Sequence, residues 1–191
     1  MNNMSYNIIN NLPIDFCYND YDRKSLKVFS DWFFNNKSER IAILVEELNS
    51  DHQCWSPDYT RASLDLLAKW LSRNIEKVPL TASQYRKKRL ITPSYIDIQE
   101  WRLSDSSLSR IFDVGVYFGE MMIYHHHELK WEQYLKNKKN NDYGHMIINM
   151  GNISMNPIWL VYIQALKIVN GIYSETCLSD LYETWCDFLQ N

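Results

Sequence analysis

The stretch DVGVYFGEMMIYHHHELKW, residues 113–131, decides the fold because its spacing predicts the central helix of the chain. Residues three, four and seven positions apart lie on one side of a helix, so a helix over residues 106–124 has two distinct faces. The apolar face has Leu108, Ile111, Gly115, Phe118, Gly119 and Met122. The other face has Asp113, Tyr117, Glu120 and Tyr124, with Arg110 as its cation, which is typical of a covered surface or a binding surface.

Gly115 and Gly119 lie four residues apart on the apolar face, and this spacing predicts that a neighbouring helix approaches closely. Each glycine costs about 1 kcal/mol of helix stability relative to alanine, so we expect tight packing to offset it. A phosphate loop is excluded, because GVYFG lacks the preceding strand and the Gly-Lys pair of such loops. Ser154, in GNISMNP, does not match the nucleophile motif GxSxG.

The segment that follows predicts a β-hairpin over residues 128–150. ELKWEQYL alternates partly between apolar and polar residues, KNKKNNDYG is a polar loop, and HMIINM is an apolar, β-branched run. Asn156-Pro157 then supplies a cap and a proline at the first helical position, and Asn170-Gly171 is a typical helix end. A last helix is expected over residues 179–189.

Upstream of the central helix, helical spacing predicts one helix from Ser25 and a second over residues 38–48, with Asn35-Asn36 separating them into a helical hairpin. After a loop over residues 49–58, the segment SLDLLAKWLSRNIEKV predicts an amphipathic helix capped by Thr60 or Ser63. The apolar face of that helix has Leu64, Leu67, Leu71 and Ile75.

Two shorter helices are expected before the central one. Thr81 and Gln84 fit a capping box that begins a helix through RKKR, residues 86–89, and Pro93 ends it. A second short helix over residues 95–103 leads to Asp105 or Ser106 as the cap of the central helix. RKKR is interpreted as a solvated helical face, because four basic residues on an acidic chain are weak evidence for a nucleic-acid patch.

Length and composition favour a single domain over residues 1–191, with an irregular segment over residues 1–22 and a hairpin insertion over residues 128–150. The predicted fold class is α+β and mainly α: one helical domain with one small β-hairpin. A net charge of -3 argues against non-specific nucleic-acid binding, so no nucleic-acid partner is expected. An aromatic content of 14% permits a protein-binding role.

The first residues lack the basic start and apolar run of a secretory signal, so we expect a cytoplasmic protein. No membrane association is expected, because the most apolar segment, residues 158–173, is shorter than the roughly 20 residues of a membrane span. Cys17, Cys54, Cys177 and Cys186 are widely scattered and are expected to be free thiols. No cofactor is expected.

The run His125, His126, His127 suggests a metal site, since imidazole binds zinc, nickel and copper. On a helix, however, consecutive side chains point about 100° apart, so a site needs further ligands such as Glu128 or His145. We therefore expect a cluster at the helix end and no metal site.

Asp113 and Glu120 lie two helical turns apart, about 10 Å along the axis, and such a separation permits an acid and base pair of the glycosidase type. No sugar-binding pattern accompanies them. Pairing with Arg110, Lys130 or backbone amides, or a role in an interface, is the favoured interpretation.

Trp131 and Tyr143 flank the predicted hairpin turn, beside the charged residues Glu132 and Asp142. Aromatic residues next to charges are common in the centres of protein interfaces. The same two rings are equally suited to packing the hairpin against the helices, and the sequence leaves both alternatives open.

The combination of SLDLLAKWL, DVGVYFGE, LKWE and a hairpin loop that ends in MNP resembles small cytoplasmic bacterial proteins of the immunity type. These are encoded among polymorphic toxin and contact-dependent growth inhibition systems, and the resemblance covers about half of the chain. It implies a stoichiometric inhibitor without enzymatic activity that binds a cognate toxin domain, for which a basic nuclease domain is one form. No functional residues are carried over from the family.

From the chain's own pattern we expect the partner-binding residues to be Asp113, Tyr117, Glu120, Trp131, Glu132, Asp142 and Tyr143. Two alternatives stand beside this hypothesis. One is a small hydrolase-like enzyme that uses Asp113 and Glu120, and the other is a regulatory protein-interaction module.

Overall fold

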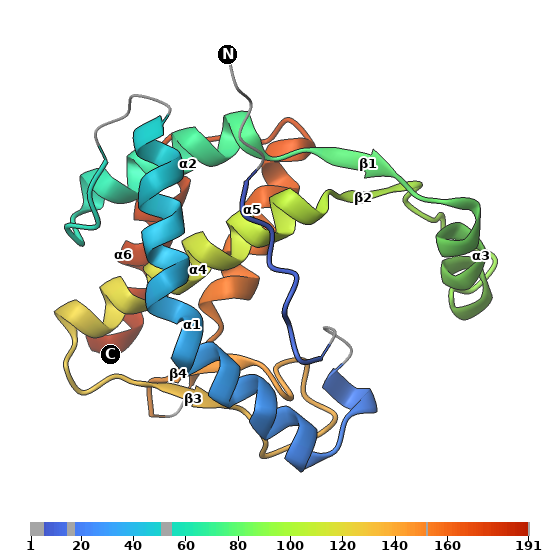
Figure 1. The fold of residues 1–191 in the computed structure, drawn as a ribbon, viewed down its shortest axis with the longest axis horizontal. Coiled ribbons are helices and arrows are strands. Elements are labelled where there is room, and N and C mark those ends of the chain that lie inside the picture. Colours follow the sequence, from blue (N-terminus) through green and yellow to red (C-terminus); the bar gives the residue numbers. More distant parts are fainter. Residues whose placement is uncertain (1–5, 15–17, 51–54, 152, 191) are drawn as a thin grey trace.

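The computed structural model describes residues 6–14, 18–50, 55–151 and 153–190 (Figure 1). Within these residues the chain forms six α-helices, one short 3-10 helix and five short strands. The helices are η1 (Tyr18–Asp20), α1 (Arg23–Ser50), α2 (Arg61–Asn74), α3 (Ala82–Ile91), α4 (Asp105–His125), α5 (Pro157–Val169) and α6 (Cys177–Gln190). The strands are β1 (Lys77–Pro79), β2 (Trp101–Leu103), β3 (Trp131–Gln133), β4 (Met146–Asn149) and β5 (Ser154–Met155). The predicted fold class, α+β and mainly α, is confirmed.

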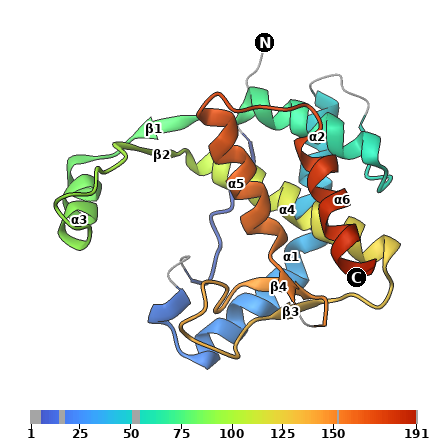
Figure 2. The ribbon, with the colours of Figure 1, turned by 180° about the vertical axis from the view of Figure 1, so that it is seen from behind.

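Helix α4 lies at the centre of the molecule, and every residue from 111 to 119 is buried. Helix α1 crosses it on one side, whereas α5 and α6 cover the other side, as Figures 1 and 2 show from the front and from behind. The cap of α4 is Ser104, whose hydroxyl accepts a hydrogen bond from the Ser107 amide at 3.1 Å. The prediction of Asp105 or Ser106 as cap was wrong, because the extended backbone of β2 continues through Ser104.

Helix α1 is one continuous helix of 28 residues, so the predicted helical hairpin with a break at Asn35-Asn36 was wrong. Asparagine is only a weak helix breaker, with a cost of about 0.7 kcal/mol relative to alanine. One buried stripe continues across the asparagines and outweighs that cost. The stripe consists of Leu26, Phe29, Phe33, Arg40, Leu44 and Leu48.

The two glycines of α4 allow close packing, but against different elements. A Cβ atom on Gly115 would lie 2.6 Å from the Cα atom of Ile158, so α5 packs directly on the backbone of α4 there. This confirms the predicted close approach of a helix. A Cβ atom on Gly119 would lie 2.1 Å from the ring of Trp131, so this glycine accommodates an indole of β3 and not a second helix.

A second antiparallel sheet, which the sequence pattern did not predict, pairs β1 with β2 and joins Lys77 to Leu103. The predicted helix over residues 95–103 was wrong, because residues 101–103 pair with residues 77–79 and no apolar helical stripe competes with that pairing. Helix α2 ends at Asn74, before this strand, and Thr60 caps its start. The Thr81 and Gln84 capping box of α3 is confirmed.

The predicted hairpin over residues 128–150 is present as β3 and β4, with Trp131 opposite Ile148. Strand β5 adds a third strand to this sheet. The predicted caps of α5 are confirmed: the Asn156 side chain accepts a hydrogen bond from the Trp159 amide, and Pro157 occupies the first turn. Gly171 follows the helix with φ +79°, a left-handed conformation that glycine adopts without strain.

The predicted irregular segment over residues 1–22 is irregular in its described part up to Ile14 and forms η1 at Tyr18–Asp20. Residues 1–5 and 15–17 lie outside the described residues. Tyr6 and Ile14 are buried in the same hydrophobic core as Leu178 of α6. The amino-terminal segment and the last helix thus share one core.

Candidate functional site

Asp113 lies inside the core and forms an ion pair with Arg40 of α1. The Arg40 guanidinium donates from Nε to Oδ1 at 2.7 Å and from Nη2 to Oδ2 at 2.6 Å, and the Tyr6 hydroxyl also donates to Oδ2. Burial raises the pKa of Asp113 to about 6, although the bonds from Arg40 and Tyr6 act in the opposite direction. Asp113 is fully buried, so it is not available as the partner-contact residue that the sequence suggested.

The pairing of Asp113 is structural, but its partner differs from the expected ones. Arg110 and Lys130 were the anticipated cations. Arg110 instead places its guanidinium over the ring of Tyr6, at 4.6 Å from the centroid, and bonds to the carbonyl of Asn74 at 3.2 Å. Two arginines therefore enclose Tyr6 and fix the amino-terminal segment to the helices.

Tyr117 is also fully buried and serves as a support for the loop before α2. Its hydroxyl lies 2.6 Å from the Ser63 hydroxyl and accepts a hydrogen bond from the Tyr59 amide at 3.0 Å. Burial raises its pKa to about 12, so the phenol stays neutral. The Tyr117 side chain is therefore enclosed in the core and is not part of an exposed surface, as the binding-residue prediction would require.

Tyr59 has a left-handed backbone with φ 57°, which is rare for a bulky side chain. Its ring stacks between Tyr117 and Tyr124, with centroid distances of 5.4 Å and 4.7 Å, and its carbonyl lies 2.7 Å from Nε2 of His125. Strained conformations of this kind persist where the surroundings enforce them, and they are concentrated at functional sites. The strained Tyr59 thus lies against the carboxy-terminal end of α4, at Tyr124 and His125.

Glu120 joins three elements. One carboxylate oxygen, Oε1, accepts from Nζ of Lys37 at 2.7 Å and from the indole nitrogen of Trp131 at 2.7 Å. Trp131 is buried with its ring over Gly119, so the pair anchors the three-stranded sheet to α4. Glu120 and Trp131 are thus packing residues, and Glu120 is only partly accessible.

The remaining hairpin residues also take part in packing. Tyr143 is buried, and the half-buried Asp142 accepts a hydrogen bond from the Asn156 side chain at 2.9 Å. Glu132 is half-buried on β3. Of the two alternatives for Trp131 and Tyr143, the packing interpretation is confirmed, and the expected binding surface around the hairpin does not form a cluster of exposed side chains.

The three histidines have separate surroundings. His125 contacts the Tyr59 carbonyl, Nε2 of His126 lies 3.6 Å from Sγ of Cys186, and His127 is exposed. In the described part of the chain, no group of three or more His, Cys, Asp or Glu side chains is arranged to hold a metal ion.

Cys177 and Cys186 are free thiols, as predicted, whereas Cys17 and Cys54 lie outside the described residues. Burial raises the pKa of both described thiols, which disfavours the reactive thiolate.

A different surface, which was not predicted from the sequence, combines exposed aromatic side chains with acidic ones. It lies on α6 beside the carboxy-terminal end of α4, on the opposite side of the molecule from α3 (Figure 2). We call it the α6 face. Its residues are Tyr124 and His125 of α4 and Asp180, Glu183, Asp187 and Phe188 of α6.

The α6 face is more acidic than the chain as a whole. No lysine or arginine occurs from residue 168 to residue 191, whereas this stretch has four acidic residues. Tyr124 and Phe188 are each 55% exposed, and the Phe188 ring packs on Trp185 with centroids 5.5 Å apart. Glu183 forms an exposed ion pair with Arg61 at the start of α2. The one-sided charge of the last 24 residues was the available sequence signal.

A cavity of about 330 Å³ opens on another side of the body, between α4, α5 and the amino-terminal segment. Its wall is mainly aromatic and aliphatic, with His145 as a polar group. The lining residues include Tyr18, Phe112, His145, Ile158, Trp159 and Tyr162. Burial lowers the pKa of His145 below its ordinary value, so the imidazole is neutral at pH 7.

Comparison with protein-family models, with curated proteins and with solved structures finds no match for this chain. None of the described helices combines the length and apolar character needed to cross a membrane.

Proposed function

We propose that this chain is an immunity-type protein that binds a cognate bacterial toxin domain and neutralises it by stoichiometric inhibition in the cytoplasm. The observation that carries the proposal is the α6 face, which combines two exposed aromatic rings, Tyr124 and Phe188, with the acidic residues of α6. We assign the toxin contact to this face. The buried residues that were predicted to bind the partner, such as Asp113 and Tyr117, instead stabilise the fold that carries this face.

The chemistry of the α6 face suits a basic partner. Carboxylates that face a basic surface accelerate association, and aromatic anchors that become buried supply most of the affinity. Phe188 and Tyr124 are the anchors, and Asp180, Glu183 and Asp187 supply the charge. A nuclease domain, which needs a basic surface to bind nucleic acid, is the toxin class that fits best.

Packing under Tyr124 holds one anchor of the α6 face in place, which lowers the entropic cost of binding. Tyr124 stacks on Tyr59, and Tyr59 is held by the buried Tyr117 and by His125. His125 in turn lies 6.0 Å from Tyr182 of α6, measured between ring centroids. Tyr124 and His125 are therefore positioned before a partner arrives.

The pairing of the central carboxylates supports binding over hydrolysis. An acid and base pair needs two carboxyl groups that reach a substrate in a cavity. Asp113 is enclosed by Arg40 and Tyr6, and Glu120 is engaged by Lys37 and Trp131. The hydrolase-like alternative is thus less well supported than the binding function.

The test is titration of the purified chain against the toxin domain encoded next to it, with inhibition of the toxin and affinity as readouts. The variant Asp187→Lys with Phe188→Ala reverses one charge and removes one anchor of the α6 face. We expect affinity to fall at least tenfold, because one aromatic anchor contributes about 2 kcal/mol when it is buried in an interface.

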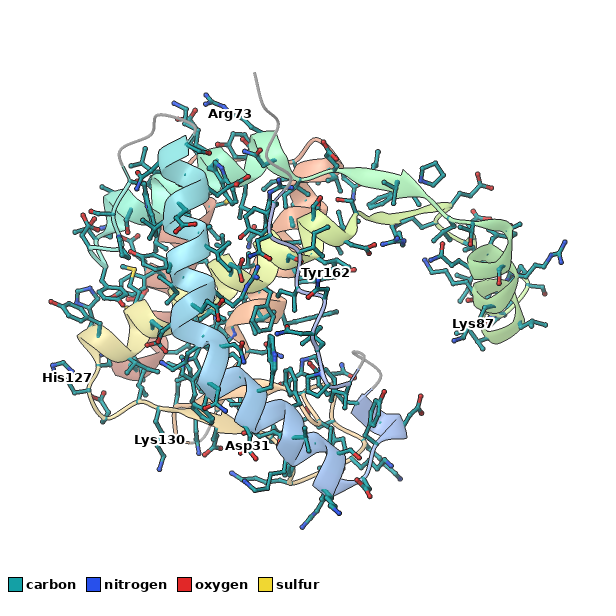
Figure 3. All side chains as sticks on the ribbon, in the orientation of Figure 1. Asp31, Arg73, Lys87, His127, Lys130 and Tyr162 are labelled. Carbon is teal, nitrogen blue, oxygen red and sulfur yellow. The ribbon has the colours of Figure 1, made fainter. Side chains whose placement is uncertain are left out.

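The matched control is Asp31→Lys with Val28→Ala on α1, which makes the same kinds of change at exposed positions of a helix that lies on the other side of α4 from α6 (Asp31 in Figure 3). It should bind like the unmodified chain. Equal losses in both variants would remove the α6 face as the contact, and failure of the unmodified chain to bind the toxin would refute the immunity function. Binding to a partner other than a toxin, in a genome with no toxin gene beside this one, would identify a regulatory protein-interaction module.

A further inference from the structure

An arm projects from the body and carries α3 at its end (Figure 1). We define the arm as residues 77–103, which comprise β1, α3, the connection after it and β2. Helix α3 has no buried residue. Leu90, Ile91 and Tyr95 are 86%, 80% and 86% exposed, respectively, which is unusual for three large apolar side chains so close in sequence.

The tip of the arm is nevertheless a defined structure. The capping box closes the start of α3, and Arg89 closes its end by donating to the carbonyls of Thr92, Pro93 and Ile96. A helix of ten residues is marginally stable in water on its own, so these local bonds need support from packing. The exposed apolar residues of the arm are where we expect another surface to pack on it.

The arm and the remainder of the chain have opposite charge. Six basic and two acidic residues lie between Lys77 and Leu103, which leaves 14 basic and 21 acidic residues elsewhere. The basic arm of one copy is thus complementary in charge to the acidic body of a second copy. Lys87, labelled at the tip in Figure 3, lies far from the body of its own copy and cannot satisfy that attraction internally.

The body has an apolar surface that can receive the exposed side chains of the arm. The cavity of about 330 Å³ is lined largely by rings and aliphatic side chains. At its edge the half-exposed Trp159 stacks on Tyr162 with centroids 5.1 Å apart. Tyr162 lies on the side of the body toward which the arm extends, as Figure 3 shows. This surface is large enough to accept one or two apolar side chains.

We propose that two copies of the chain exchange arms, with α3 of each copy packed on the Trp159 and Tyr162 surface of the other copy. Leu90, Ile91 and Tyr95 are the apolar contacts, and the basic residues of α3 face the acidic body. A two-fold arrangement makes the contact twice and closes the assembly, so it forms a dimer and no fibre. Phosphate groups of a nucleic acid would satisfy the basic residues but leave the three apolar side chains uncovered.

Arm exchange goes beyond the immunity function and is independent of it. The α6 face lies on the side opposite the arm in Figure 2, so a dimer presents two toxin-binding faces. Each copy then inhibits one toxin domain.

The test is sedimentation equilibrium of the full chain over a range of concentrations, at low and high salt. We expect a species of twice 22.9 kDa that dissociates more readily as salt is raised. The variant Leu90→Ser with Tyr95→Ser should raise the dimer dissociation constant at least tenfold. Both residues are exposed, so circular dichroism and thermal unfolding should show an unchanged fold.

The matched control is Phe34→Ser with Val28→Ser, which removes two exposed apolar side chains from α1. It should leave the dimer intact. As a direct test of the contact, a chemical cross-link between residue 95 and α5 should join an isotope-labelled copy to an unlabelled copy in a mixed sample.

A monomer at every concentration would overturn arm exchange, as would a dimer that the arm variant leaves unchanged. A monomeric chain whose arm variant loses affinity for the toxin would also overturn it and would assign the arm to the toxin interface. Toxin titration of the arm variant separates these outcomes from a failure of the immunity function.

Discussion

The buried pair of Arg40 and Asp113 gives the sharpest prediction about what holds the fold together. The side chains are 7% and 0% exposed, and the guanidinium makes two bonds to the carboxylate. In Asp113→Ala the guanidinium stays buried without its counter-charge. Removal of one partner from a buried pair costs about 3–5 kcal/mol, a large fraction of the about 5–15 kcal/mol that a domain of this kind has.

The assay is urea unfolding of Asp113→Ala, Arg40→Met and the double variant Arg40→Met with Asp113→Ala. Each single variant should lower the free energy of unfolding by about 3–5 kcal/mol, whereas the double variant should lose much less, because it leaves no unpaired charge. The control Tyr6→Phe removes one hydrogen bond to the same carboxylate and should cost about 1 kcal/mol.

The pair should also respond to pH in a defined direction. Because burial raises the pKa of Asp113 to about 6 from an ordinary value of 3.8, the folded state binds a proton that the unfolded state has lost in this range. The contribution of Asp113 to stability therefore falls as pH rises from about 4 to about 6. The ion-pair interpretation would be refuted if each single variant lowered the free energy of unfolding by less than about 1 kcal/mol. It would also be refuted if the double variant lost as much free energy of unfolding as the two single variants together.

Three further predictions concern stability and use the same unfolding assay. Gly115→Ala should destabilise by about 1–3 kcal/mol despite a better helix propensity, because the new Cβ atom meets the Cα atom of Ile158; an unchanged stability would show that α5 is not packed on α4 as described. Asn35→Ala should stabilise by about 0.5 kcal/mol if α1 is continuous, and no gain would favour a break at this point. Burial lowers the pKa of His145, so the unfolded state takes up its proton first as pH falls below 6.5, and stability is lost on acidification; His145→Gln should reduce this loss, and identical pH profiles for both proteins would contradict the burial of the imidazole.

Elements with strong local signals were predictable from the sequence. Helix α4 has a long apolar period, α5 has a cap, a first-turn proline and a terminal glycine, and the α3 capping box specifies its own start. These signals act over three to seven residues, a range that sequence patterns report well. The β3 and β4 hairpin was predictable for the same reason, because its strands are close in sequence.

Features that depend on distant partners were not predictable. Strands β1 and β2 have three residues each and pair across α3, so no alternating pattern announces them. Asp113 pairs with Arg40 from a helix 73 residues away, and periodicity places a carboxylate on a helix face without identifying what covers that face. The expected binding face of α4 is therefore covered at Asp113 and Tyr117, whereas Tyr124 near the end of the helix is exposed.

The α6 face is the reverse case, because its negative charge is visible in the sequence although its position is not. The chain has no basic residue after Lys167, and this asymmetry is visible without a structure. Its meaning depends on the position of α6 beside Tyr124 and His125, which only the fold supplies. Composition indicated an acidic surface, and geometry located the aromatic residues that accompany it.

Hydrogen–deuterium exchange of the chain with and without the adjacent toxin domain tests the central claim most directly, because it maps the contact without any substitution. Toxin binding should protect the amides of α6, residues 177–190, and of the end of α4, residues 120–127. It should leave the exchange of α3 unchanged. Protection confined to the arm or to the β3 and β4 hairpin would contradict the assignment of the toxin contact to the α6 face. The absence of any protection, because the chain does not bind the toxin, would contradict the immunity function itself.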